Sequence, residues 1–228
     1  MRSQADNTDR RGVAAAIAAW LLFMAAALFA ALRDGQAQWR QPVAWLGAAG
    51  TAHAPAFNVA TFVLPGLLAA YAAWRIRDTL PTSAPLIARI GAWLVLISAC
   101  GFALQGLLPL DARDLESSAS HRHALAWMLW WVAFVPGALS HAAGSAGSDS
   151  SGGSKRWPRA MASALLAVAV LWLVTLAGER LPEAAAQRLA FVVWFAWLVL
   201  ASFVTRNTQA IDADTAPAPA SSTVRRRR

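Results

Sequence analysis

LIARIGAWLVLISACGFALQGLL, residues 86–108, is an apolar run in which Arg89 is the single charged residue. A helix needs about 20 apolar residues to cross the roughly 30 Å of hydrocarbon in a bilayer. Similar runs occur at 13–32, 54–74, 123–142, 158–177 and 188–205. They are rich in Ala and Leu and lack the alternation of barrel strands, and lipid offers the backbone no hydrogen-bond partners. The sequence therefore predicts an all-α polytopic membrane protein, a six-transmembrane-helix bundle.

Two prolines fall inside these runs, Pro65 in the second and Pro136 in the fourth. Proline removes a helical hydrogen bond and kinks the helix, which a membrane protein tolerates where a neighbouring helix covers the freed carbonyl. We expect both prolines to lie at bends that face the bundle.

The composition excludes an ordinary soluble domain. The chain is 57% hydrophobic and 14% charged, whereas charged residues make up about a quarter of a soluble domain. The net charge of +8 does not indicate nucleic-acid binding, because that requires basic residues clustered on one folded face. Membrane lipids are the predicted partners, without nucleic acid, and the sequence predicts no particular oligomeric state.

The basic residues predict the orientation, because Lys and Arg gather on the cytoplasmic side of a membrane. With six spans, both termini lie on one side together with the second and fourth connections. That side holds fourteen of the 20 Lys and Arg residues and the other side holds six, namely Arg33, Arg40, Arg113, Arg122, Arg180 and Arg188. The Ala- and Arg-rich usage is typical of bacteria. We expect an inner-membrane protein with a cytoplasmic tail at 1–12, a transmembrane domain at 13–205 and a disordered basic cytoplasmic tail at 206–228.

Polar residues interrupt the apolar pattern at the predicted periplasmic ends of several spans. Such groups are costly at that depth unless they are paired or wetted. We expect them to line one outward-opening pocket that binds a ligand; the candidate residues are Asn58, Gln105, Asp111, His121, His123 and Arg188.

Several kinds of chemistry are compatible with this set. Asp111 with His121 or His123, helped by the nearby serines, has the residue types of a catalytic site, although a solvated loop has the same composition.

A metal or haem site has less support. The two histidines are two residues apart, so on a helix they point in nearly opposite directions, and their spacing matches no standard metal site. Haem requires two His on facing helices, which the spans do not offer. We therefore predict neither a metal nor a cofactor. Asp111 and Arg188 are also suited to a structural ion pair between the third and sixth spans.

Short blocks of the chain resemble, in order, those of the DUF998 family of bacterial and archaeal integral membrane proteins. These blocks are VAWLGAAGTAHAPAFN (43–58), GFALQGLLPLD (101–111), HRHALAW (121–127) and QRLAFVVWFAW (187–197). The resemblance implies a six-span helical bundle without an established function. The matching positions are Leu46, Gly47, Pro55, Asn58, Pro109, Asp111, His121 or His123, Gln187 and Arg188. The chain departs from the family at Ala44 and Trp45, where Ser and Glu are usual, which weakens any mechanism that needs a carboxylate there. The first outer loop is also distantly similar to the Frag1/DRAM/Sfk1 membrane proteins, which are linked to lipid handling.

Two functions remain open at this point. The first is a non-enzymatic membrane protein that binds or senses a lipid or small apolar ligand, because a polar mouth above apolar walls suits such a molecule. The alternative is a membrane-embedded enzyme that acts on a lipid or lipid-linked substrate through Asp111 and a histidine. A structural partner in a larger complex is a third possibility.

Overall fold

The structure is a computed structural model that describes residues 12–25, 28, 41–80, 82–146, 153–177 and 180–215. At 145, 146, 153–157, 159 and 204–215 it describes only the backbone. Within these ranges the chain forms helices and turns without any strand, which confirms the all-α prediction. The elements are the helix Gly12–Ala25, α2 (Val43–Leu46), α3 (Ala54–Asn58), the π-helix η2 (Val59–Val63), α4 (Leu64–Asp78), α5 (Leu86–Leu107), α6 (Ser118–Ala146), α7 (Gly153–Thr175) and α8 (Glu183–Thr215).

Four helical segments are long and apolar enough to cross a membrane. They are Ala54–Asp78, Leu86–Leu107, Ser118–Gly144 and Glu183–Phe203, while Gly12–Ala25 and Ala160–Thr175 are shorter apolar helices. Each corresponds to one of the six predicted apolar runs. Helix α8 continues to Thr215, beyond the predicted end of the last run at 205. The tail at 1–11, the end of the first run at 29–32 and residues 216–228 lie outside the described residues.

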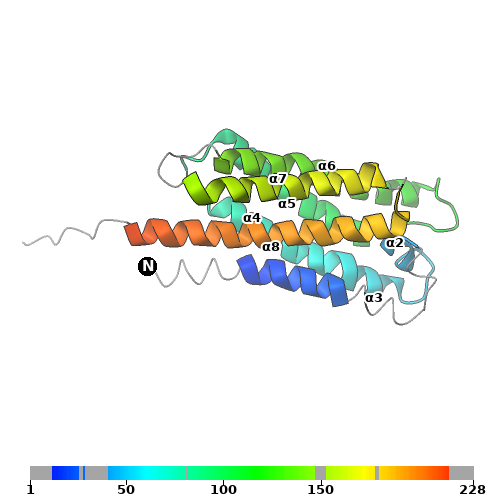
Figure 1. The fold of residues 1–228 in the computed structure, drawn as a ribbon. Helices are drawn as coiled ribbons and strands as arrows, with labels where there is room; N and C mark the ends of the chain where they lie inside the picture. Colours follow the sequence, from blue (N-terminus) through cyan, green and yellow to red (C-terminus); the bar gives the residue numbers. More distant parts are fainter. Residues whose placement is uncertain are drawn as a thin grey trace, which may run out of the picture.

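The long helices form a closed arrangement. Helix α5 packs most extensively on α6, and further contacts join α4 to α5, α6 to α7, α7 to α8 and α8 back to α4. The helix Gly12–Ala25 lies beside α4 and α8, because Gly12 approaches the Arg75 side chain and the Phe23 ring contacts Phe195. Successive helices run in alternate directions, and the helix Gly12–Ala25 begins at the end of the bundle where α8 terminates (Figure 1).

An aromatic core fills the centre of this arrangement. The Phe102 ring of α5 contacts the rings of six residues on four other elements; these are Phe23, Phe62, Trp130, Phe191, Trp194 and Phe195. All seven side chains are fully buried or nearly so. The outward faces carry the apolar side chains that meet lipid, such as Ile90 and Ile97 on α5.

Small residues bring the backbones of α5 and its neighbours close together. A Cβ atom on Gly101 would lie 2.9 Å from the Trp130 backbone nitrogen, and one on Gly66 would lie 2.7 Å from the Ala103 backbone. Close backbone approach compensates for the weak hydrophobic drive between helices in lipid, because it increases van der Waals contact. The glycines of the apolar runs therefore set where α4, α5 and α6 cross.

The two prolines of the apolar runs have different environments. Pro65 is buried at the start of α4, directly after the π-helix Val59–Val63. The wider π turn accommodates a residue that lacks an N–H and would crowd the preceding turn of an α-helix. Pro136 lies within α6 but is exposed. The prediction that Pro136 faces the bundle was therefore wrong, because Gly137 is the residue that faces α5.

Candidate functional site at the α2–α3 end

Two segments close one end of the bundle, residues 41–53 and the loop 108–117, which together we call the cap. The first turns of α8 hold the first segment. The Gln187 Oε1 atom accepts a hydrogen bond of 2.7 Å from the Val43 N–H, and the Arg188 guanidinium donates to the Gln41 carbonyl at 2.9 Å and to the Ala184 carbonyl at 3.1 Å. The structure thus places Arg188, a predicted ligand-binding residue, on backbone carbonyls of the cap and of its own helix.

Asn58 ties the cap to the second span. Its Nδ2 atom donates a hydrogen bond of 2.8 Å to the Gly47 carbonyl, and the side chain is buried. A Cβ atom at position 47 would overlap the Asn58 amide. Glycine is therefore required at this close approach. Residues Gly47 and Asn58, eleven positions apart, form a single local unit.

The loop 108–117 is organised around the hydroxyl of Ser120, at the start of α6. This hydroxyl accepts from the Asp111 N–H at 3.1 Å and donates to the Asp114 carbonyl at 2.9 Å. The Asp111 carboxylate accepts from the Arg113 N–H at 2.9 Å. The Ala49 N–H donates to the Leu110 carbonyl at 2.8 Å and so joins the two segments of the cap.

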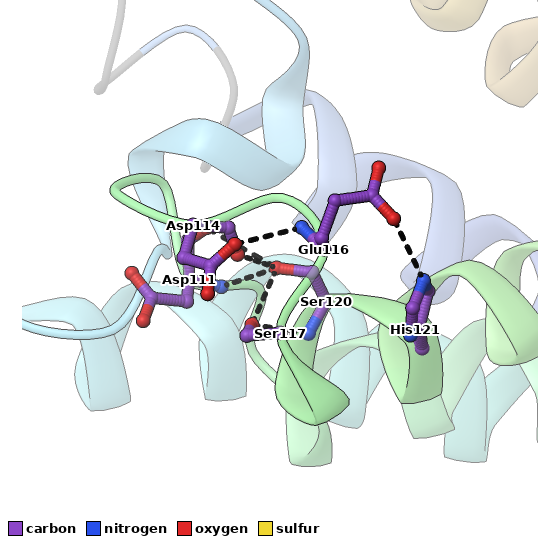
Figure 2. Close-up of polar contacts among 6 residues, drawn as sticks. All are labelled: Asp111, Asp114, Glu116, Ser117, Ser120 and His121. Carbon is purple, nitrogen blue, oxygen red and sulfur yellow. Dashed lines mark hydrogen bonds and ion pairs between the residues drawn. The ribbon is translucent and has the colours of Figure 1, made fainter.

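The two histidines have unrelated environments. His121 is exposed, and its Nε2 atom lies 3.5 Å from the carboxylate of Glu116, which is also exposed. His123 is buried, and its Nδ1 atom lies 2.9 Å from the Leu108 carbonyl, which assigns the Nδ1 proton because a carbonyl only accepts. Asp111 and His121 lie on opposite sides of Ser120 (Figure 2). Within the described residues, Asp111 forms no hydrogen bond or ion pair with either histidine or with Arg188.

Polar atoms without partners lie deeper, within the bundle. Gln105 is fully buried on the last turn of α5, and among the described residues neither its Oε1 nor its Nε2 atom has a hydrogen-bond partner. The Thr61 hydroxyl and the indole nitrogens of Trp130 and Trp194 share this condition. The sequence identified Gln105 but missed the other three, because Thr and Trp are ordinary residues of apolar spans.

Gln105 lies close to the cap. The next residue, Gly106, packs so tightly that a Cβ atom there would lie 2.8 Å from the Asn58 carbonyl oxygen and 2.8 Å from Phe62. His123, in the second turn of α6, forms a hydrogen bond with the carbonyl of Leu108, the residue that follows the last residue of α5. Gln105 therefore belongs to the turn of α5 that packs against Asn58, one of the residues that hold the cap.

No three His, Cys, Asp or Glu side chains gather as they would around a metal ion in the described part of the chain. Two hollows lie at the other end of the bundle. One is a space of about 10 Å³ beside Arg75, and the other is a groove of about 320 Å³ between the end of α4 and the start of α5.

Neither the curated proteins nor the solved structures include a match to this chain. Residues 14–204 match the family described as "Protein of unknown function (DUF998)". This match runs from the helix Gly12–Ala25 to residue 204 of α8, which itself continues to Thr215. Several positions that carried the resemblance, Gly47, Asn58, Gln187 and Arg188, are those that fasten the cap. The chain belongs to the DUF998 family of helical membrane proteins.

Proposed function

We propose that the protein crosses the bacterial inner membrane six times and has both termini in the cytoplasm. The shorter helices Gly12–Ala25 and Ala160–Thr175 lie alongside the four long spans, in directions that alternate with theirs. Arg75, Arg77 and Arg89 lie at the end where the first helix begins, while Arg113 and Arg122 lie at the cap end. Arg180 and Arg188 also lie at the cap end, but over the whole sequence fourteen of the 20 Lys and Arg residues fall in segments predicted for the first end and six in segments predicted for the other. This excess supports the cytoplasmic placement of the first end.

Cysteine labelling tests this topology. In a Cys100→Ser background, which removes the chain's single cysteine, Thr51→Cys in the cap should react with a membrane-impermeant maleimide in cells with a permeabilised outer membrane. Thr82→Cys, between α4 and α5, should react only after the inner membrane is opened. Both positions are exposed, so poor access within the protein does not explain a difference. The reverse labelling pattern would contradict the proposed orientation.

We further propose that the protein binds the polar end of a lipid or small apolar ligand beneath the cap. Gln105 carries this proposal: a buried polar group without a partner costs about 1–3 kcal/mol. Because Gln105 is fully buried, its amide offers donors and an acceptor within the apolar interior of the bundle, and a few polar groups among apolar side chains are the usual composition of a ligand site. A ligand that hydrogen-bonds to Gln105 would recover this cost.

The ligand reaches Gln105 when the cap moves. The contacts that hold the cap are a few hydrogen bonds, from Gln187, Arg188 and Asn58 to backbone atoms, together with the packing of a few apolar side chains, namely Val43, Ala44, Ala48 and Leu110. Each hydrogen bond contributes on the order of 1 kcal/mol, and the apolar contacts involve few and mostly small side chains, so we expect opening of the cap to cost less than unfolding of the bundle. The cap therefore acts as a cover that a ligand displaces.

Enzymatic action through Asp111 and a histidine has less support. The Asp111 carboxylate is engaged by the Arg113 N–H, and the exposed His121 faces Glu116. His123 directs its Nδ1 atom to a backbone carbonyl. A binding or sensing role requires no convergence of these groups.

The variant Gln105→Leu tests whether the Gln105 amide binds a ligand or only stabilises the fold. Gln105→Leu keeps the volume and removes the unpartnered atoms, so we expect the free energy of unfolding in detergent to rise by about 1–3 kcal/mol. Retention of co-purifying lipid or apolar ligand, measured by native mass spectrometry, should fall by about tenfold, since one hydrogen bond contributes up to about 1.5 kcal/mol.

Ser98→Ala is the matched control, because Ser98 is also fully buried and unpartnered on α5 but lies two turns farther from the cap. It should stabilise the protein modestly and leave ligand retention unchanged. A destabilised Gln105→Leu protein that retains its ligand would overturn the proposal, since that result assigns Gln105 a structural role.

A further inference from the structure

The groove between α4 and α5 lies at the end of the bundle opposite the cap. Its volume is about 320 Å³, and it is lined by Arg77, Asp78, Leu80, Thr82, Arg89 and Trp93. Arg77 belongs to the last turn of α4 and Arg89 to the first turn of α5. The two arginines therefore line the groove from adjacent antiparallel helices.

The charges in this groove are unbalanced. Asp78 is the one carboxylate among the lining residues, and Arg75 binds it at 2.7 Å. The Arg77 guanidinium lies over the Trp93 ring, 4.7 Å from its centroid. Within the described residues neither Arg77 nor Arg89 has a carboxylate partner. The groove therefore presents two uncompensated guanidinium groups, which suit an anion.

The guanidinium group favours a particular anion. It presents its N–H groups in a planar fork that matches the oxygens of a phosphate. Stacking on an aromatic ring already restricts the side chain, so less conformational entropy is lost when the anion binds. Arg77 is held in this manner by Trp93. Thr82 adds a hydroxyl at the rim. Phosphate is thus the chemical group that the groove fits best.

The surroundings of the groove favour a phosphate that carries acyl chains. Below Arg89, the outward face of α5 continues as Ile90, Trp93 and Ile97, which are 47%, 49% and 40% exposed. This spacing forms an apolar stripe along the helix. Trp74 and Trp93 mark the depth of the headgroups, where tryptophan concentrates. A lipid whose phosphate enters the groove would lay its chains along this stripe.

We propose that the groove between α4 and α5 binds the phosphate of an anionic phospholipid headgroup. Basic pockets between spans on the cytoplasmic side are suited to such headgroups. The site differs from the one proposed beneath the cap in position, in charge and in the part of the lipid that it recognises. Its assignment to the inner leaflet depends on the proposed topology, but its selectivity for phosphate does not.

Lipid selectivity in nanodiscs tests the proposal. The full-length protein is placed in phosphatidylcholine nanodiscs that contain a minor fraction of phosphatidylglycerol, and the retained lipids are measured by native mass spectrometry. We expect wild-type protein to retain phosphatidylglycerol selectively and Arg77→Gln/Arg89→Gln to lose about tenfold or more of this selectivity. The single variant Arg89→Gln removes a side chain that has no carboxylate partner among the described residues, so it should fold normally. It should show a partial loss of selectivity and serves as a check if the double variant misfolds.

Arg113→Gln/Arg122→Gln is the matched control, because it removes the same charge from exposed arginines at the cap end. It should keep the selectivity. If both double variants lost the selectivity for phosphatidylglycerol equally, the selectivity would come from the overall positive charge of the protein and not from the groove, and the proposal would be overturned. Competition by millimolar inorganic phosphate as effective as that by phosphatidylglycerol would also overturn it, since the groove would then take free phosphate. Retention of the ligand that depends on Gln105 should persist in Arg77→Gln/Arg89→Gln, so the two sites fail separately.

Discussion

Replacement of Phe102 by alanine should lower the free energy of unfolding by about 3–5 kcal/mol, the range for large buried aromatic side chains. Phe102 is fully buried, and its ring centroid lies 4.8 Å from that of Trp194 and 5.0 Å from that of Phe191. Truncation leaves a cavity among rings from four other elements, which cannot all move inward at once. The measurement is reversible unfolding in detergent, followed by tryptophan fluorescence.

Phe203→Ala provides the control for this substitution. Phe203 lies on α8 and is 39% exposed, so detergent or lipid replaces the lost ring and the expected change is below about 1 kcal/mol. Phe102→Leu should fall between the two alanine variants, because it refills part of the cavity. Equal stabilities for Phe102→Ala and Phe203→Ala would contradict the assignment of Phe102 to the centre of the core.

A single methyl group at position 66 should destabilise the protein by about 1–3 kcal/mol, the usual cost of overpacking. The Cβ atom of Gly66→Ala would lie 2.6 Å from the Ala103 Cβ and 2.7 Å from the Ala103 Cα and N atoms. Two of these three are backbone atoms, so relief requires that α4 and α5 separate. The free energy of unfolding in detergent again measures the effect.

Ala124→Val adds two methyl groups, more volume than Gly66→Ala, on the exposed face of α6 and should change the stability by less than about 0.5 kcal/mol. If Gly66→Ala proved neutral while Ala124→Val did not, the close crossing of α4 and α5 would be wrong. The combination of Gly66→Ala with Ala103→Gly should recover part of the loss, because it removes one of the contacted atoms and leaves the backbone contacts.

The apolar runs predicted the helices well because hydropathy is a local property. Residues 86–108 were expected to form one helix, and α5 spans Leu86–Leu107. Helix ends were less accurate: α6 begins at Ser118 and includes polar residues that the run at 123–142 left out. Helix ends depend on caps and tertiary contacts, so an apolar run does not define them.

The candidate residues were chosen for polarity, and polarity alone does not distinguish a ligand contact from an internal hydrogen bond. Asn58 and Arg188 satisfy backbone groups of residues 41–47, and His123 bonds to Leu108. Gln105 was in the same set, yet its amide has no partner among the described residues. The position of a backbone carbonyl, which depends on how the chain folds back, makes the difference.

The sequence by itself determined that this chain is an all-helical membrane protein of the DUF998 family, because long runs of Ala, Leu and Val have one stable conformation in lipid. Tertiary structure alone decided which polar groups meet. Gly47 and Asn58 fit together only after the chain turns at His53, which has a positive φ, and Arg77 meets Trp93 only because α4 packs against α5. Such meetings depend on distances between helices, which are set by packing and not by any local pattern of residues.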